Sequence, residues 1–555
     1  MNVFLFFISI VGSTILAFFI WRSVYHPIFP LIWVFSISAY LISNLVKQHI
    51  HLPQVNFYPK LILLVLILLL PLGIRLANMN PTRIHMDDVI TAYFSETHDF
   101  TKLNFFSGIP ENKGEWVSRF PTPFFILQQF FFFLVPPSFM SIKYSILPYV
   151  LINSMFLYLL VKILRDKKTA AIAVCLYAFS APSLYLETLG LHFVSSTALF
   201  LVFFYVALLY LKSPTLPKAG ILGVITGFNY LFYITSFIAF PFLIITFLFQ
   251  LVKIHSLKIL RDFLIALVGF TITFGPFALY GLRFDNYFLS RINQVSLLTG
   301  SWSDASQKIE EGKSPFPFVE KNIRLSLQSL YTDDIGGHGG YNFGNLAFFD
   351  RYSLILTALG TVIALVLFLR NIGIFLILCV ILVSFVTGMV FSIPPPAFHR
   401  ASLAFPFLTI IMSLPFSVFL RIKRLPIFVR VSVTVIFILV ILAQNELYFI
   451  EQSQKENNNA DLRLVNLIDT KYPNRHVYIA SFPGFVFQKV YYFSPEKNVL
   501  SIQTDYHDNF IRSFRPDEKY LYIMTLPHIF EEKFKSLDPN GKIIRYSRNY
   551  SLFVN

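Results

Sequence analysis

Long apolar stretches recur along most of this sequence and limit what it can fold into. A helix needs about 20 mainly apolar residues to cross the hydrocarbon core of a bilayer. Hydrophobic residues make up 55% of the chain and charged residues only 14%, so a soluble fold would lack the polar surface to cover itself. The sequence therefore predicts an all-α polytopic membrane protein with about 13 transmembrane helices. The stretches lie at residues 1–20, 29–46, 58–77, 143–162, 168–186, 192–211, 219–233, 236–252, 262–281, 352–369, 372–392, 401–420 and 428–447.

The distribution of Lys and Arg predicts the orientation of these helices. The first stretch has no basic segment before it and no A-x-A site, so we interpret it as a retained span and not a signal peptide. Lys and Arg accumulate in cytoplasmic loops. With a cytoplasmic N-terminus, the short outer loops carry only Arg22 and Arg400, and the cytoplasmic side carries Lys47, Lys60, Lys162, Arg165, Lys167, Lys168, Lys212, Lys218, Lys253, Lys258, Arg261, Arg370, Arg421, Lys423, Arg424 and Arg430. We therefore expect a multi-pass protein of the cytoplasmic membrane. The net charge of +15 is explained by the Lys and Arg of the cytoplasmic loops, so we expect no nucleic-acid partner.

The same charge count decides two unusual apolar stretches. Residues 121–137 are short and have Gln128 and Gln129 at their centre, and a crossing there would put the basic cluster at 162–168 outside. We expect an interfacial or re-entrant helix at this point. The long run 219–252 lies between two basic loops, so we expect a helical hairpin that turns near residues 233–236.

The polar regions define the remaining organisation. Residues 1–57 would form additional N-terminal helices before a membrane core at 58–447, whose large loops 78–142 and 282–351 face away from the cytoplasm. After a linker at 448–460, residues 461–555 read as a small extracytoplasmic α/β domain. Buried strands are expected at 476–481 and 520–525, with final strands at KIIRYS and YSLFVN. We expect this domain to lie over the catalytic face without supplying a base, since Asp505 and Asp508 have no motif partner.

The first large loop, PTRIHMDDVITAYFSETHDF, contains two adjacent acids, Asp87 and Asp88. Desolvation at the bilayer surface and mutual repulsion would raise a carboxylate's pKa, and such a group is a suitable general base for a hydroxyl. The alternative is an ordinary helix start, where Asp is favoured. The sequence leaves both open.

Further polar candidates lie in the later loops. Residues 331–353 contain a glycine-rich run that would let backbone N–H groups approach an anion or a sugar, or would simply form a flexible loop. His399 and Arg400 stand where a span begins. Arg400, Arg119 and Arg83 could each hold a phosphate at the interface or merely anchor a helix end by snorkelling.

Several other chemistries lack support. His85, His98, Asp87, Asp88 and Asp99 show no H-x-x-x-H or H-E-x-x-H spacing, so we assign no metal ligands, and a requirement for Mg²⁺ or Mn²⁺ is left open. Cys175 and Cys379 lie in apolar runs, which excludes a disulfide framework. Neither a G-x-S-x-G elbow nor a nucleotide-phosphate motif is present.

The order of these features resembles the glycosyltransferase family 39 group, in the GT-C fold class of protein mannosyltransferases and aminoarabinose transferases. The acidic loop resembles the family's "DE" loop, with Asp87 and Asp88 at its Asp and Glu. The family's short helix with a Lys or Arg and prolines resembles the segment RFPTPFFILQQFFFF. The family's basic turn and the small-residue-rich span after it resemble the segment KILRDKKTAAIAVCLYAFSAPSLYLETLGLH. PPPAFHRASLAFPFL resembles a late segment that places Arg400 at its arginine. DDIGGHGGYNFGNLAFFD resembles a "G-D…R-H-N…P-G…L-D" loop, with matching positions at Asp334, His338, Asn342 and Asp350.

There are departures from the family pattern. The family's Glu is Asp88 here, and two additional spans precede the acidic loop. The arginine common after the Ser-Pro region is absent, and Glu187 and His192 lie there instead. We include Glu187 among the candidate substrate-loop residues.

The resemblance implies a sugar transferase that uses a polyprenyl-phosphate-linked donor and inverts the sugar carbon. Asp87 would activate the acceptor hydroxyl, Arg400, with Arg119 as second choice, would stabilise the leaving phosphate, and the 331–350 loop would close over the sugar. We expect Asp87 and Arg400 to face each other across one cavity. The acceptor is unknown.

Two rival functions are weighed against it. The first is a transporter or lipid flippase that makes no bond, which charged residues buried within spans would favour. The second is an O-antigen-type ligase or polymerase, which normally centres on one large loop late in the chain, whereas the acidic loop here is early.

Overall fold

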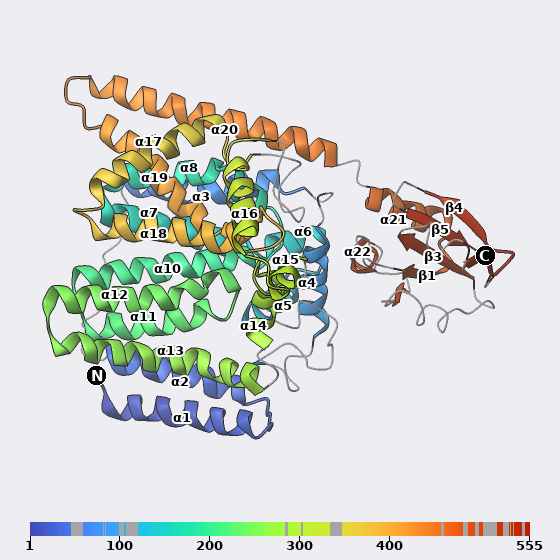
Figure 1. Ribbon diagram of the computed structural model, residues 1–555, viewed down its shortest axis with the longest axis horizontal. Coiled ribbons are helices and arrows are strands. Elements are labelled where there is room, and N and C mark those ends of the chain that lie inside the picture. The colour runs from blue at the N-terminus through green and yellow to red at the C-terminus, as the bar shows by residue number, and fades with distance from the viewer. Residues whose placement is uncertain are drawn as a thin grey trace. The chain divides into compact units, whose positions relative to one another are not determined.

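In the computed structural model the chain forms two compact units, whose helices and strands are labelled in Figure 1. The helical unit comprises Met1–Asn78, His98–Leu127 and Ile146–Phe449, and the mixed unit comprises Met79–Thr97, Gln128–Ser145 and Ile450–Asn555. The structure describes residues 1–45, 59–80, 83, 85–98, 105–106, 120–283, 287–300, 304–333, 347–456, 460–480, 487–493, 499–502, 519–525, 532, 534–536, 538–546 and 550–554.

Most of the helices belong to the helical unit. Two of them, α5 (Pro123–Leu134) and α20 (Ile427–Glu456), are divided between the units. The others are α1 (Val3–Trp21), α2 (Phe29–Leu45), α3 (Pro59–Asn78), α7 (Leu147–Leu164), α8 (Lys167–Phe179), α9 (Ala181–Leu186), α10 (Phe193–Lys212), α11 (Leu216–Asn229), η2 (Ile234–Ile238), α12 (Ala239–Ile254), α13 (Leu257–Arg283), α14 (Tyr287–Val295), α15 (Asp304–Glu310), α16 (Phe316–Gln328), α17 (Arg351–Leu367), α18 (Ile372–Phe385), η3 (Val386–Val390), η4 (Phe398–Ala401) and α19 (Ala404–Phe419).

Two groups of helices pack most closely in this unit. In one, α1, α2 and α11 pack with α13, and in the other, α8 packs with α3, α7 and α19, while α19 also packs with α17. Glycines permit these contacts. A Cβ on Gly223 of α11 would lie 2.0 Å from the carbonyl oxygen of Ala266, and one on Gly360 of α17 would lie 2.1 Å from that of Ile411. Small residues of this kind let membrane helices approach closely.

Large apolar side chains cover the outside of the helical unit. Phe4 of α1, Val366 of α17 and Phe428 of α20 are all more than two-thirds exposed, a pattern that suits a lipid surface better than water. Among the described residues, seven helical segments are long and apolar enough to cross a membrane, so the chain is a multi-pass membrane protein. They are Val3–Trp21, Phe139–Leu164, Phe193–Lys212, Ile234–Ile254, Leu257–Arg283, Ile372–Val390 and Ile427–Glu451.

The predicted apolar stretches all fall on helices, but several of these helices are short. Shorter apolar helices lie at Phe29–Leu45, Leu64–Asn78, Pro123–Leu134, Arg351–Leu367 and Ala404–Phe419. The total of about 13 spans and the cytoplasmic N-terminus therefore stay predictions. The break in the long 219–252 run is confirmed, because η2 separates α11 from α12.

Helix α20 runs further than the sequence analysis expected. It continues to Glu456 and so enters the predicted linker at 448–460. No glycine or proline interrupts the chain from Ile427 to Glu456, and polar composition alone does not end a helix.

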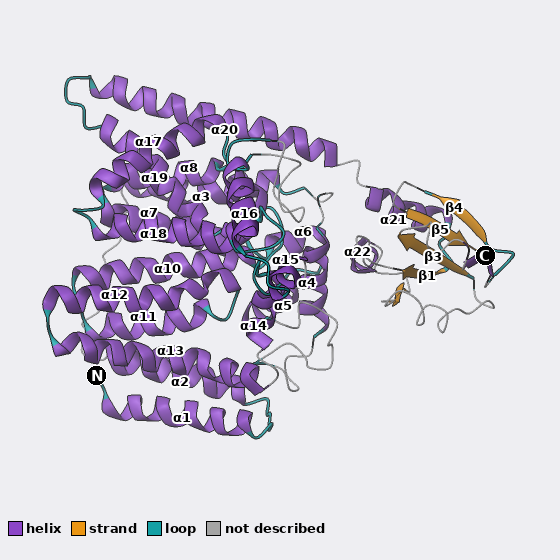
Figure 2. Cartoon of the chain, in the orientation of Figure 1, coloured by secondary structure: helices purple, strands orange, loops and turns teal. Residues whose placement is uncertain are grey.

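The mixed unit combines short helices with one sheet (Figure 2). The sheet has the order β2-β1-β3-β5-β4, in which β1 is parallel to β2 and β3, and β5 is antiparallel to β3 and β4. Alternate side chains form two apolar faces, one built on Val477 and Leu521 and the other on Tyr478 and Tyr522. The elements are α4 (Met86–Thr97), α6 (Phe139–Tyr144), α21 (Ala460–Lys471), β1 (His476–Ala480), α22 (Phe487–Phe493), β2 (Val499–Ile502), β3 (Tyr520–Thr525), β4 (Lys542–Arg545) and β5 (Tyr550–Val554).

Candidate active site

The two acids singled out in the sequence lie in the first turn of α4. The Nδ1 atom of His85 accepts the backbone N–H of Asp87 at 3.0 Å, and the backbone N–H of His85 donates to Oδ2 of Asp88 at 3.3 Å. This is a reciprocal capping arrangement, with His and Asp in the usual places of Ser or Thr and Glu. The same ring nitrogen lies 3.9 Å from Oδ2 of Asp87.

Asp87 and Asp88 have different surroundings. The side chain of Asp87 is 13% exposed, whereas Asp88 is only 2% exposed. Burial raises the pKa of Asp88, and nearby positive charge, including that of Lys143, offsets part of this rise. The Oδ1 atom of Asp88 has no hydrogen-bond partner within the described part of the chain. The helix-start interpretation therefore describes Asp88, while the role of Asp87 as a base stays a prediction.

Lys143 of α6 holds the segment that leads into α4. It is 2% exposed, and its Nζ donates to the carbonyl oxygens of Asn80, at 2.5 Å, and of Arg83. Arg83, a predicted phosphate-binding residue, is itself buried, and its charge acts on Asp88. Basic groups from two segments thus surround the buried acid, and Arg83's part in donor binding stays a prediction.

Gln128, one of the two polar residues at the centre of the predicted interfacial helix α5, joins two neighbouring segments. Its Oε1 accepts the hydroxyl of Ser95 in α4 at 2.7 Å, and its Nε2 donates to the Ser145 hydroxyl at 2.9 Å. Its side chain is buried, and a buried amide requires such partners. The amide therefore ties α5 to the helix that carries the acids.

Arg400 lies in the short helix η4 and is buried. Its Nη1 donates to the carbonyl oxygen of Ile393 at 2.8 Å. The backbone here is tightly packed, because a Cβ on Gly388 would lie 2.5 Å from the carbonyl oxygen of Arg400. The guanidinium is therefore oriented by the backbone of its own segment, and its contact with a phosphate stays a prediction.

An aromatic cluster surrounds His192, which the sequence analysis noted only as a neighbour of Glu187. The His192 ring is 4.7 Å from the Tyr233 ring and 5.0 Å from the Phe120 ring, measured between centroids. Phe193, the next residue, packs against His399 at 5.2 Å, so the cluster reaches the segment that carries Arg400. Phe120 directly follows the predicted Arg119 in the sequence.

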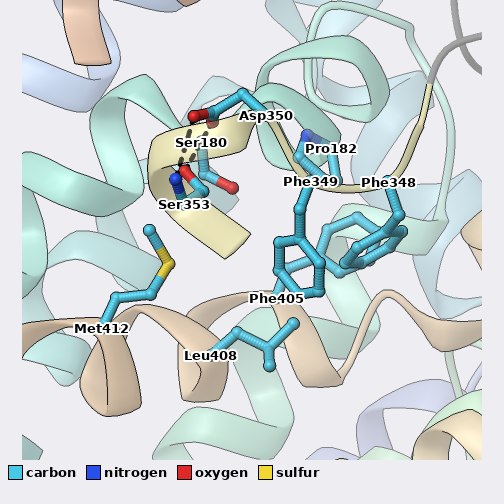
Figure 3. A pocket seen from close by; sticks show the side chains of 9 residues that line it. All are labelled: Ser180, Pro182, Phe348, Phe349, Asp350, Ser353, Phe405, Leu408 and Met412. Atoms are coloured by element: carbon cyan, nitrogen blue, oxygen red, sulfur yellow. Dashed lines mark hydrogen bonds between the residues drawn. The ribbon is translucent and has the colours of Figure 1, made fainter. Parts of the chain in front are cut away.

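Asp350 caps α17 and also joins it to α20. Its Oδ1 accepts the backbone N–H of Tyr352 at 3.0 Å. Oδ1 also accepts the backbone N–H of Ser353 at 2.9 Å, and Oδ2 accepts the Ser353 hydroxyl at 2.5 Å (Figure 3). Nδ2 of Asn445 donates to Asp350 at 3.1 Å and to the carbonyl oxygen of Phe179 at 2.7 Å. These contacts give the predicted substrate-loop residue a structural role, and its contact with substrate stays a prediction.

A pocket beside Asp350 brings together three of the motifs on which the family resemblance depends (Figure 3). The end of the glycine-rich loop, the Ser-Pro region and the late segment all line it. About 10 Å³ is open to the centre of a water-sized sphere, which is room for roughly one water molecule, so a sugar does not fit. The lining residues are Ser180, Pro182, Phe348, Phe349, Asp350, Ser353, Phe405, Leu408 and Met412.

Glu187 forms a buried ion pair with Arg75, a residue that the sequence analysis missed. Arg75 Nη2 lies 2.9 Å and Nε 3.0 Å from Glu187 Oε2, and Arg75 also donates to the carbonyl oxygens of Tyr177 and Ala178. On the other side, Glu187 Oε1 accepts the Tyr177 hydroxyl at 2.5 Å. The pair joins α3 to α8 and α9. The available signal was a single Arg within an apolar stretch, which marks a residue that needs a partner.

Some predicted positions lie outside the described residues. They are Arg119, Asp334, His338 and Asn342, together with Asp99, Asp505 and Asp508. Within the part of the chain that the structure describes, no group of three or more His, Cys, Asp or Glu could hold a metal ion. The need for a divalent cation therefore stays open.

Comparison with solved structures identifies proteins with a similar fold. No family model and no curated protein matches the sequence. Among solved structures, ArnT from Cupriavidus metallidurans bound to undecaprenyl phosphate superposes with a TM-score of 0.56 at 11% identity, over 88% of this chain and 97% of that one. The oligosaccharyltransferase of Archaeoglobus fulgidus gives 0.52 in its apo form, at 14% identity over 86% and 71%, and 0.50 in its complex with Zn and sulfate, at 13% identity over 89% and 73%. The chain therefore has the fold of the GT-C membrane glycosyltransferases.

Proposed function

We propose that the protein is a membrane glycosyltransferase that moves a sugar from a polyprenyl-phosphate-linked donor to an extracytoplasmic acceptor. The observation that carries the proposal is the likeness to ArnT, which extends over almost the full length of both chains. That crystal structure contains undecaprenyl phosphate, the lipid that such a transfer releases. A likeness in fold alone leaves the sugar and the acceptor open.

In the proposed reaction, Asp87 accepts the proton of the acceptor hydroxyl. The acceptor oxygen attacks the anomeric carbon, the bond from that carbon to the phosphate oxygen breaks, and the polyprenyl phosphate leaves as an anion. The sugar carbon is inverted, through an oxocarbenium-like transition state. Asp87 suits this role better than Asp88, because it retains some exposure while Asp88 is buried in the helix cap. Arg400 would stabilise the leaving phosphate, since a guanidinium matches phosphate geometry.

Three variants test this assignment. A general base contributes about 10²–10⁴-fold in rate, so Asp87→Asn should lose most transfer and keep donor binding. Asp88→Asn is the matched control, because it makes the same change one residue away and should be milder. Arg400→Ala should weaken donor binding and turnover together. The assay is transfer of labelled sugar from a polyprenyl-phosphate donor in membranes, and full activity in Asp87→Asn would remove the proposed base.

The proposed topology places the N-terminus in the cytoplasm and the C-terminal region outside, so that the acidic loop faces the extracytoplasmic side. The support is the Lys and Arg asymmetry of the loops. Reporter fusions after Lys168 and after Asn555 should show opposite sides of the membrane. A cytoplasmic C-terminal reporter would contradict both the topology and the side on which transfer is proposed.

A transporter or flippase is the alternative, and the buried Arg75 within α3 is the observation that favours it, since such residues often mark transport pathways. Here, however, Arg75 is fully paired with Glu187 and main-chain carbonyls, as a residue that joins helices would be. Reconstituted protein that moves donor lipid across vesicles without cleaving the sugar–phosphate bond would favour transport.

A further inference from the structure

The C-terminal part of the chain contacts α4 directly within the mixed unit. Helix α22 presents two adjacent tyrosines to Glu96, which lies in the last turn of α4. The Tyr491 hydroxyl donates to Oε1 of Glu96 at 3.0 Å, and the Tyr492 hydroxyl donates to Oε2 at 2.9 Å. Both oxygens of one carboxylate are thus held by a segment almost four hundred positions later in the sequence.

Ring contacts and apolar packing support these two hydrogen bonds. The ring of Tyr93 in α4 meets the ring of Tyr491 edge to face, with centroids 5.2 Å apart. Tyr492 is buried and packs with Phe139 at 6.2 Å. Val89 and Ala92 of α4 belong to the same buried cluster. Several kinds of contact therefore fix α22 to α4, and Phe139 of α6 packs beside them.

The docked face of α4 is the one opposite Asp87. Val89, Ala92, Tyr93 and Glu96 follow the three- and four-residue spacing of one helix face. At about 100° per residue, Asp87 lies about 160° around the axis from Val89. The contact with α22 therefore leaves the Asp87 face of α4 uncovered by α22.

The hydrogen bonds from the tyrosines are of a strong kind. A hydroxyl that donates to a carboxylate makes a charge-assisted bond, which is roughly twice as strong as a neutral one. Burial, followed by the charge of Glu96, raises the pKa of Tyr491 to about 12 and also raises the pKa of Tyr492. Both phenols thus remain protonated donors at neutral pH.

We propose that Glu96, Tyr491 and Tyr492 are positioning residues through which the C-terminal part of the chain fixes the rotation and depth of α4, and with them the direction of Asp87. This rests on the proposed function, in which Asp87 is the base. The hydrogen bond between Ser95 and Gln128 also holds this end of α4. Loss of the α22 contact should therefore shift α4 without unfolding it. A misplacement of about 1 Å at a reacting group can cost about 10²-fold in rate.

The test uses the full-length protein and the transfer assay with a polyprenyl-phosphate sugar donor. Glu96→Ala, and the double variant Tyr491→Phe with Tyr492→Phe, should each lower kcat per folded protein at least tenfold with unchanged donor KM. Glu96→Gln keeps one acceptor oxygen and should recover part of the rate. Glu310→Ala is the matched control for Glu96→Ala, because Glu310 is exposed in α15, and it should behave as wild type.

The pattern of combined variants separates positioning from mere stability. If Glu96 acts through the two tyrosines, adding Glu96→Ala to the double Tyr variant should cause no further loss of kcat. Wild-type kcat in both the Glu96→Ala and the double Tyr variant would overturn the proposal, as would a loss of kcat that only follows a lower melting temperature. If either variant fails to fold, Glu96→Gln and the single Tyr491→Phe provide the same comparison.

The result is distinguishable from failure of the proposed function. Inactive Asp87→Asn together with fully active Glu96→Ala would reject only the positioning role. Fully active Asp87→Asn would reject the base itself, whatever the Glu96 variants do.

Discussion

Replacement of Glu187 by glutamine separates a structural role for this acid from the substrate role that the sequence suggests. In the structure its carboxylate is 5% exposed and accepts hydrogen bonds from Arg75 and Tyr177. Glutamine has nearly the same shape but no charge. It would keep one acceptor oxygen but remove the negative charge that compensates the buried Arg75 guanidinium, which also donates to the carbonyl oxygens of Tyr177 and Ala178.

The magnitude follows from that uncompensated charge. Removal of one partner from a buried ion pair typically costs about 3–5 kcal/mol. The contacts that remain to main-chain carbonyls should keep the cost toward the lower end of that range. Because the pair joins α3 to α8 and α9, we expect a lower melting temperature in detergent and a loss of transfer that follows the folded fraction.

Two variants sharpen the comparison. Glu310→Gln makes the same chemical change at an exposed position in α15 and should leave the melting temperature unchanged. Combining Arg75→Met with Glu187→Gln removes the orphaned charge, so the double variant should lose less stability than the sum of the two single variants. A melting curve of Glu187→Gln equal to that of wild type, combined with lost transfer, would refute this reasoning and favour contact with substrate.

Two further predictions follow from local geometry. Gly388→Ala should lower the free energy of unfolding by about 1–3 kcal/mol through overpacking and weaken donor binding, because its Cβ would displace the Arg400 backbone. Gly73 has open space around it, so Gly73→Ala is the control and should not destabilise the protein. Melting curves and donor titration compare the two variants. Burial raises the pKa of Asp88 from 3.8, so its contribution to stability is present below the unfolded-state pKa and is lost as the pH rises through the folded-state pKa. In Asp88→Asn the melting temperature should fall less between acidic and neutral pH than it does in the wild type. An unchanged pH dependence of the melting temperature would contradict the raised pKa of Asp88.

The sequence predicted the helices well, because apolar length is a local property. The break between α11 and α12 was also predictable, since two basic loops flank a run too long for one span. The strands at 476–480 and 520–525 coincide with the expected buried stretches. Helix α20 continues to Glu456, into the predicted linker, because no residue type there stops a helix.

The candidate site was harder to predict, because its contacts join distant parts of the chain. Arg75 and Glu187 are 112 positions apart. The two tyrosines that hold Glu96 lie in the C-terminal region, where the sequence pattern indicated strands and no contact with the acidic loop. A hydropathy count tolerates one Arg in a span and does not reveal its partner. Asp350 matched the family loop, but its capping contacts with Ser353 and its bond to Asn445 appear only in the structure.

The hydrogen bonds and the burial of each acidic side chain rank the candidate acids, which the sequence alone could not do. Glu187 and Asp350 each accept several hydrogen bonds within the fold, and Asp88 is buried in a helix cap. An acid held in this way contributes to stability, since loss of a buried partner leaves the other group unsatisfied. Asp87 and Asp350 both keep partly exposed side chains, but Asp350 caps α17 through the backbone N–H groups of Tyr352 and Ser353. Asparagine or glutamine at the first three positions should therefore change the melting temperature before it changes transfer, and Asp87→Asn should do the reverse. If the four variants ranked in the same order by loss of melting temperature and by loss of transfer, burial would not separate structural from reacting acids in this protein.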